Sequence, residues 1–129
     1  MIIKFKTRSL KHKEIIDITD EVQKYLKKQP IKEGVLHLLV THTSCALTTA
    51  DLDPGTDLDM LEAFEKMIPK INFRHEHDPS HTPDHILSSL IGTSLSLPFE
   101  QGKLILGIWQ RVVLVEFNGP KERTIIVYL

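Results

Sequence analysis

Histidines are the residues of this sequence best suited to chemistry. The chain has seven of them, and four lie between His75 and His85. A neutral imidazole nitrogen is a good ligand for zinc and other divalent transition metals. His75 and His77 are two residues apart, so an extended segment would direct both side chains to the same side. His85 would lie in the first turn of a helix, where the partial positive charge disfavours imidazolium and favours a neutral ring.

Two interpretations of this histidine-rich segment stay open. A metal site needs three or four converging ligands. The spacing matches neither H-E-x-x-H nor paired C-x-x-C motifs. The segment is therefore either part of a metal site or a polar surface loop that is rich in histidine.

His42 forms a second candidate site together with the hydroxyl residues that follow it. A strand predicted over 34–40 leads into His42, Thr43 and Ser44. Functional groups often stand at the end of a strand, where the scaffold positions them. The hydroxyls and backbone N–H groups of Thr43 and Ser44 could hold an anion. The alternative is a histidine at the edge of the core that is hydrogen-bonded to a neighbouring carbonyl.

A third group of candidate residues lies near the end of the chain. Trp109 and Gln110 precede Glu116 and Arg123 on what we predict to be neighbouring strands. Arg123 could grip a phosphate or a carboxylate, because its planar guanidinium donates two parallel hydrogen bonds. The alternative is a cross-strand ion pair with Glu116, with Trp109 in the core.

The elements that must position these residues predict an α+β fold. Alternation at the N-terminus and after residue 93 indicates strands, and three segments have helical spacing or capping signals. We expect an antiparallel, sandwich-like sheet with two or three helices, and a C-terminal third that forms a meander. The predicted strands are 2–7, 34–40, 94–99, 104–109, 111–117 and 123–129, and the predicted helices begin near Thr19, Thr56 and Thr82.

Length and composition restrict the class of protein. With 129 residues, the chain has room for a single domain over 1–129. The formal net charge of −1 provides no basic field, so we expect neither nucleic acid nor a membrane as a partner. The N-terminus lacks the apolar run of a signal peptide, and Cys45 has no second cysteine with which to pair. These features predict a cytoplasmic protein, and we expect Cys45 to be a buried, inert thiol.

Taken in order, the motifs of the chain resemble the YjbQ-like family of small uncharacterised bacterial and archaeal proteins. No single motif is diagnostic, but the ordered set covers nearly the whole chain. The matching stretches are His42–Thr48, the acidic run Asp51–Asp59, His75 with His85, Leu90–Leu95, Gly102–Gln110, and Glu116–Pro120 with Arg123.

The resemblance implies a metal-binding homotrimer with its site near a subunit boundary. The family's histidines fall on His42, His75 and His85, which are then the metal ligands. Zinc is the expected ion, with magnesium as the alternative for diphosphate chemistry. Thr43, Ser44, Trp109, Gln110 and Arg123 are then the expected residues for binding a small phosphorylated metabolite.

Three functions follow as hypotheses. Family members are associated with a secondary thiamine-phosphate synthase activity, which joins a pyrimidine methyl diphosphate to a thiazole phosphate and releases diphosphate. In that reaction His42, Glu116 and Arg123 would be the catalytic residues, with the metal and Arg123 neutralising the departing diphosphate. The alternatives are a metal-dependent hydrolase, with Glu116 or a residue of the acidic run as the base, and a non-catalytic trimeric module that binds phosphorylated metabolites.

Overall fold

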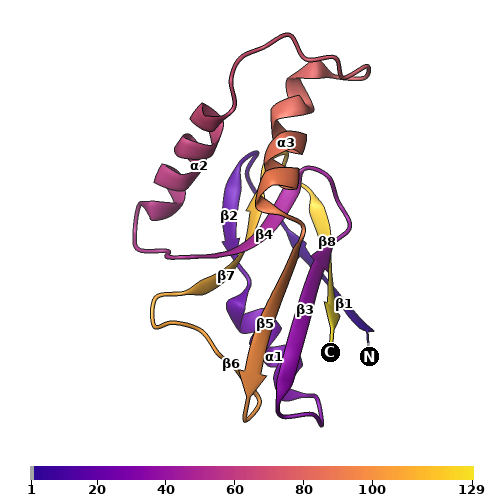
Figure 1. Ribbon diagram of the computed structural model, residues 1–129, viewed down its shortest axis with the longest axis vertical. Helices are drawn as coiled ribbons and strands as arrows, with labels where there is room; N and C mark the ends of the chain where they lie inside the picture. The colour runs from indigo at the N-terminus through magenta and orange to yellow at the C-terminus, as the bar shows by residue number, and fades with distance from the viewer. Residues whose placement is uncertain (1) are drawn as a thin grey trace.

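The computed structural model describes residues 2–129 as two β-sheets and three α-helices (Figure 1). The helices begin at Thr19, Thr56 and Thr82, as predicted; Pro69 follows the end of the second, and Gly92 caps the third. None of the described helices is long and apolar enough to cross a membrane. The elements are β1 (Ile2–Arg8), β2 (Glu14–Asp17), α1 (Thr19–Lys27), β3 (Gly34–Val40), β4 (Cys45–Ala50), α2 (Thr56–Met67), a 3₁₀ turn (Pro79–His81), α3 (Thr82–Ile91), β5 (Ser94–Glu100), β6 (Lys103–Leu104), β7 (Arg111–Glu116) and β8 (Glu122–Tyr128).

All strand pairs are antiparallel and form one five-stranded and one three-stranded sheet. The order is β1-β8-β3-β5-β6 in the larger sheet and β2-β7-β4 in the smaller. The predicted α+β class with a sandwich-like antiparallel sheet is therefore confirmed. The predicted C-terminal meander is wrong, because β7 and β8 belong to different sheets. The two ends of the chain lie side by side, with Ile2 opposite Tyr128.

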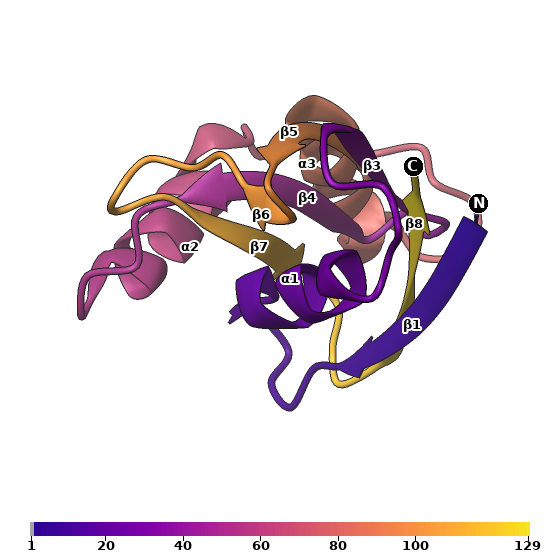
Figure 2. The same ribbon diagram turned by 90° about the horizontal axis from the view of Figure 1, so that it is seen from below.

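Strand β7 explains how the layers are held together. Its residues alternate between two hydrophobic clusters, as the period of two of a strand requires. Val112 and Leu114 are buried between the two sheets, whereas Val113 and Val115 pack on the side of α2 and α3. Helix α1 covers one end of the space between the sheets with Val22 and Leu26, which are both buried (Figure 2).

Two local features differ from the sequence prediction. Strands β2 and β4 were not predicted, because four to six residues of mixed polarity carry little periodic signal. The strand predicted over 104–109 ends at Leu104: the next partner across the ladder is Pro98, which has no N–H to donate. The strand predicted over 34–40 is β3; only one of its faces is buried, and His37 on the other face is exposed and hydrogen-bonds to Ser96.

Candidate functional site

The candidate site lies where the two sheets separate. Strand β3 ends at Val40 in the larger sheet, and β4 begins at Cys45 in the smaller sheet. The turn after α3 bridges both strands. The Val40 N–H donates to the Thr93 carbonyl and the Leu47 N–H to the Gly92 carbonyl, each at 2.9 Å. The loop 41–44 is thereby fixed beside α3, where its Thr43 carbonyl meets His85.

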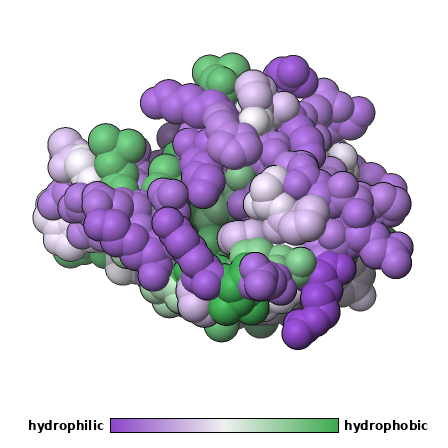
Figure 3. All heavy atoms as spheres, turned by 90° about the horizontal axis from the view of Figure 1, so that it is seen from above, coloured by the Kyte–Doolittle hydropathy of each residue, from purple (hydrophilic) through white to green (hydrophobic). Residues whose placement is uncertain are grey.

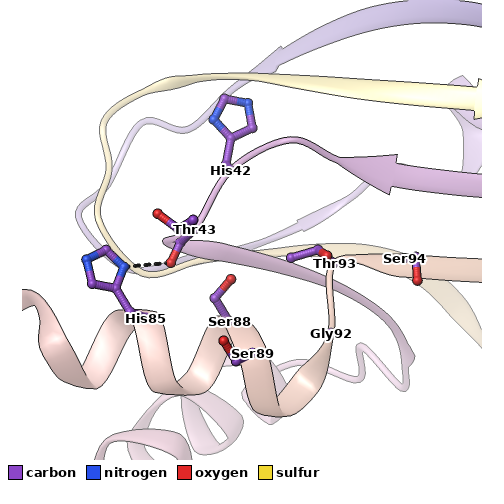
Figure 4. Close-up of a pocket in the computed structure, with 8 residues that line it drawn as sticks. All are labelled: His42, Thr43, His85, Ser88, Ser89, Gly92, Thr93 and Ser94. Atoms are coloured by element: carbon purple, nitrogen blue, oxygen red, sulfur yellow. Dashed lines mark hydrogen bonds between the residues drawn. The ribbon is translucent and has the colours of Figure 1, made fainter.

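An open, polar pocket of about 680 Å³ occupies this junction (Figure 4). We call it the histidine pocket. Its walls come from the loop after β3, from one face of α3 and from the start of β5, and they contain two imidazoles and five hydroxyl groups but no carboxylate. The lining residues are His42, Thr43, His85, Ser88, Ser89, Gly92, Thr93 and Ser94.

The hydrogen bond of His42 fixes its tautomer. Its Nε2 accepts the Thr124 N–H at 3.0 Å, so the neutral ring carries its proton on Nδ1. Burial lowers the pKa of His42 below its usual 6.5, and the charges of Arg123 and Lys121 lower it further, while Glu116 opposes them. His42 is therefore a neutral hydrogen-bond donor through Nδ1 at neutral pH.

His85 is fixed in the opposite tautomer. Its Nδ1 lies 2.7 Å from the Thr43 carbonyl oxygen and must donate to it, which leaves Nε2 as the acceptor of the neutral ring. The ring stacks on His75, with centroids 5.2 Å apart and planes at 18°. His75 in turn accepts the Asp78 N–H at Nδ1. The fold thus brings together two of the three histidines singled out from the sequence.

Arg123 and Glu116 lie beneath the loop as a buried ion pair. Arg123 is 2% exposed and Glu116 is fully buried. The guanidinium donates from Nε to Glu116 at 2.9 Å, from one terminal nitrogen to the second carboxylate oxygen, and from that nitrogen to the hydroxyl and carbonyl of Ser44. Ser9 also donates to Glu116, at 2.7 Å. These contacts hold the backbone of Ser44, next to the pocket.

Cys45 does not supply a nucleophile to the pocket. Its side chain is fully buried between the sheets. Burial raises the pKa of its thiol to about 11, while Arg123 and Lys121 oppose the rise. The thiol is therefore protonated at neutral pH and unreactive.

Trp109 and Gln110 lie apart from the histidine pocket. Trp109 is 70% exposed, in the loop between β6 and β7, and lines a separate hollow with Asp51 and Asp53. Gln110 donates to the Thr49 hydroxyl at 2.9 Å. The structure thus does not place these two residues with His42 or His85.

Sequence reasoning named Thr43 but missed the other four hydroxyl residues of the pocket, Ser88, Ser89, Thr93 and Ser94. Ser88 and Ser89 follow His85 by three and four residues, which is the spacing of one helix face. Ser88 donates to the Cys45 carbonyl at 2.6 Å, so it also ties α3 to β4. The helical spacing from His85 was a usable signal. No local pattern indicated that Thr93 and Ser94 line the pocket, because their position depends on the direction in which the chain turns from the end of α3 into β5.

The predicted metal ligands do not fit a metal ion as the structure places them. A metal needs three or four lone pairs directed at one point. The Nε2 lone pair of His42 and the Nδ1 lone pair of His75 are both occupied by backbone N–H groups. Figure 4 shows the His42 ring directed away from His85. Within residues 2–129, no group of three or more His, Cys, Asp or Glu side chains could hold the predicted zinc or magnesium ion.

Comparison with known proteins identifies the family. Residues 3–129 match the family model described as UPF0047 protein YjbQ-like. A UPF0047 protein of Archaeoglobus fulgidus is 36% identical over 121 residues, which is 93% of this chain and 94% of that protein. The UPF0047 protein YugU of Bacillus subtilis is 34% identical over 125 residues, with 96% and 95% covered. This chain therefore belongs to the UPF0047 YjbQ-like family, as its motifs indicated.

Solved structures of this family have the same fold. A YbjQ-like protein of unknown function from Sulfolobus solfataricus superposes with a TM-score of 0.91 at 28% identity, covering 98% of this chain and 94% of that chain. An uncharacterised conserved YjbQ/UPF0047 protein from Clostridium acetobutylicum gives a TM-score of 0.88 at 31% identity, with 98% of each chain covered.

These findings correct the predicted function. The relatives are named only as UPF0047 proteins or proteins of unknown function, and no name refers to thiamine synthesis or to a metal. The described residues also lack a set of metal ligands. The predicted metal-binding enzyme with thiamine-phosphate synthase activity is therefore contradicted, and so is the metal-dependent hydrolase.

Proposed function

We propose that this member of the UPF0047 YjbQ-like family binds a small metabolite by its oxyanion, such as a phosphate, in the histidine pocket. The observation that carries the proposal is the chemistry of the pocket wall. Five hydroxyl groups and two imidazoles line it, and no carboxylate does. His42 Nδ1 and the hydroxyls of Thr43, Ser89, Thr93 and Ser94 can donate hydrogen bonds, His85 Nε2 can accept one from a protonated phosphate oxygen, and no lining carboxylate repels a negative charge.

The tautomer of His42 supports an anionic ligand. Because Nε2 accepts the Thr124 N–H, the free nitrogen of the neutral ring is a donor. Lys121 is exposed and close enough to lower the pKa of His42, so it adds positive potential on this side of the pocket. Arg123 contributes indirectly, since its hydrogen bonds are to Glu116 and Ser44.

The rigidity of the wall also supports binding. His85 is held by the Thr43 carbonyl and by its stack on His75, and Ser88 is held by the Cys45 carbonyl. A polar pocket whose side chains are already oriented loses less conformational entropy when a ligand binds. We propose no catalytic step. The predicted homotrimer and cytoplasmic location stay predictions.

Calorimetry with inorganic phosphate and glycerol 3-phosphate tests the proposal, with glycerol as the phosphate-free probe. The two phosphates should bind and glycerol should not. His85→Ala and Thr93→Val should each weaken phosphate binding by about tenfold or more. His77→Ala is the matched control, because His77 is exposed and lies outside the pocket. Absence of phosphate binding to the wild type, or unchanged affinity in both pocket variants, would reject the proposal.

A further inference from the structure

A second cavity lies on the other side of α3. It has a volume of about 470 Å³ and is formed by the turn after β1, the end of α2 and the start of α3. Asp84 and Leu87 of α3 line it, whereas His85, Ser88 and Ser89 of the same helix line the histidine pocket. We call it the Asp84 cavity. Viewed from the α2–α3 end, the surface is mostly hydrophilic around a hollow with hydrophobic groups on its floor (Figure 3).

Asp84 is the unusual residue of this cavity. It is only 5% exposed and lines the cavity, and its carboxylate accepts no hydrogen bond from the residues 2–129. The same helical turn contains Thr82, whose hydroxyl oxygen is fully enclosed without a hydrogen-bond partner. A carboxylate on a residue that is largely removed from water is normally hydrogen-bonded, whereas that of Asp84 faces only the cavity. Asp84 is therefore a group that a ligand with N–H donors could satisfy.

The rest of the wall has the opposite charge and an apolar part. Lys13 is half-buried and Lys70 is exposed. Neither forms an ion pair with Asp84, although all three line the same cavity. Phe73 and Leu87 supply apolar surface, and the exposed Glu65 is also part of the lining. The cavity thus presents one buried carboxylate, one exposed carboxylate, two ammonium groups and an apolar patch, and Asp84 is paired with neither lysine.

We propose that the Asp84 cavity binds a small zwitterion, an α-amino acid with an apolar side chain. The ammonium group of the ligand would pair with Asp84, and its carboxylate would pair with Lys13 or Lys70. The apolar side chain would lie against Phe73 and Leu87. Charge-assisted hydrogen bonds of this kind orient a ligand at both ends, and burial of the apolar part supplies affinity. The proposal does not depend on the histidine pocket.

Three probes separate this ligand class from a simple cation or anion. L-leucine carries both charges, N-acetyl-L-leucine lacks the ammonium group, and isopentylamine lacks the carboxylate. Calorimetry should detect binding of leucine, with each analogue at least about tenfold weaker. Isopentylamine binding as tightly as leucine would indicate a cation site, and N-acetyl-leucine binding as tightly would indicate an anion site. Either result would overturn the proposal.

Substitution of the carboxylate provides the second arm of the test. Asp84→Asn keeps the size of the side chain and should weaken leucine binding by about tenfold or more. Asp59→Asn is the matched control, since Asp59 is an exposed residue in the first turn of α2. Thermal melting of both variants checks that they are folded. Unchanged leucine affinity in Asp84→Asn, or no binding of apolar amino acids to the wild type up to about 10 mM, would also overturn the proposal.

Discussion

Arg123 and Glu116 form a buried ion pair that also binds the hydroxyl and the carbonyl of Ser44. The pair joins β7 of one sheet to β8 of the other. Two buried charges are expensive to desolvate, and the pair is tolerated because each charge is hydrogen-bonded. Through Ser44, the pair holds the loop 41–44 that forms one wall of the histidine pocket.

Removal of one partner should be strongly destabilising. Arg123→Met leaves Glu116 buried without its counter-charge, so we expect the free energy of unfolding to fall by about 3–5 kcal/mol. Urea unfolding followed by circular dichroism measures this change. Arg111→Met is the control, because Arg111 forms a partly exposed pair with Asp17 and should cost about 1 kcal/mol or less. A loss below about 1 kcal/mol in Arg123→Met would contradict the support role.

The same pair predicts how stability depends on pH. Burial by itself raises the pKa of Glu116, but hydrogen bonds from Arg123, Ser9 and the Asn118 N–H hold it below its usual 4.5. The folded state therefore binds fewer protons than the unfolded state in this range. The ionised Glu116 therefore stabilises the fold above about pH 4.5, and this contribution is lost as the pH falls through its folded-state pKa. Urea unfolding from about pH 6 to about pH 3 should show this loss, and Glu116→Gln should show a flatter profile.

Gly119 should tolerate no side chain. A Cβ atom there would lie 2.2 Å from the Lys11 carbonyl oxygen and 2.5 Å from the Ser9 hydroxyl. Because the nearest atom belongs to the backbone, we expect Gly119→Ala to cost about 2–3 kcal/mol of unfolding free energy. In Gly107→Ala, the added Cβ meets no atom closer than 3.6 Å, and the change should be within about 0.5 kcal/mol. Equal melting temperatures for the two variants would disprove the steric argument.

The pKa of His42 should respond to Lys121. Burial is the largest cause of its lowered pKa, and Lys121 lowers it further because a positive neighbour disfavours imidazolium. Lys121→Met should therefore raise the pKa of His42, as followed by the NMR shifts of the ring protons during a pH titration. Lys103→Met is the control, since Lys103 lies at the far end of the larger sheet, in β6. A pKa of His42 that does not move in Lys121→Met would show that Lys121 does not act on the pocket.

Cys45 should resist alkylation in the native protein. With the pKa of its thiol raised to about 11, only about one molecule in a thousand carries the thiolate at pH 8. Its burial between the sheets blocks access as well. Mass spectrometry after treatment with iodoacetamide should find little modification in buffer and complete modification in strong denaturant. Rapid modification of the folded protein would refute this assignment.

The sequence predicts the helices better than the sheets for a physical reason. Helical spacing and residues that end helices, here Pro69 and Gly92, are local signals, and α2 and α3 end next to them. Alternation identifies a strand such as β8, but it does not say which strand is its neighbour. The meander was predicted from sequence order alone. The arrangement in two sheets depends on long-range packing around β7, and no local sequence pattern indicates this packing.

In the candidate site, too, contacts that are local in the sequence were predicted and long-range contacts were not. His75 and His85 come together as expected, because a short loop and a helix start hold them close in sequence. The convergence of His42 on the same point was inferred from the resemblance, and the Thr124 N–H instead directs its ring toward β8. Asp84 gave no signal in the sequence, since one acidic residue in the first turn of a helix is ordinary. Only its burial distinguishes it.

The turn of Gly92 and Thr93 couples the two layers mechanically. It gives one carbonyl to Val40 in the larger sheet and the neighbouring carbonyl to Leu47 in the smaller. A shift of either sheet relative to the other would break one of these two hydrogen bonds, and a shift of α3 along its axis would strain both. A small displacement at this turn is therefore shared by the whole fold, so the molecule should open here as one cooperative unit.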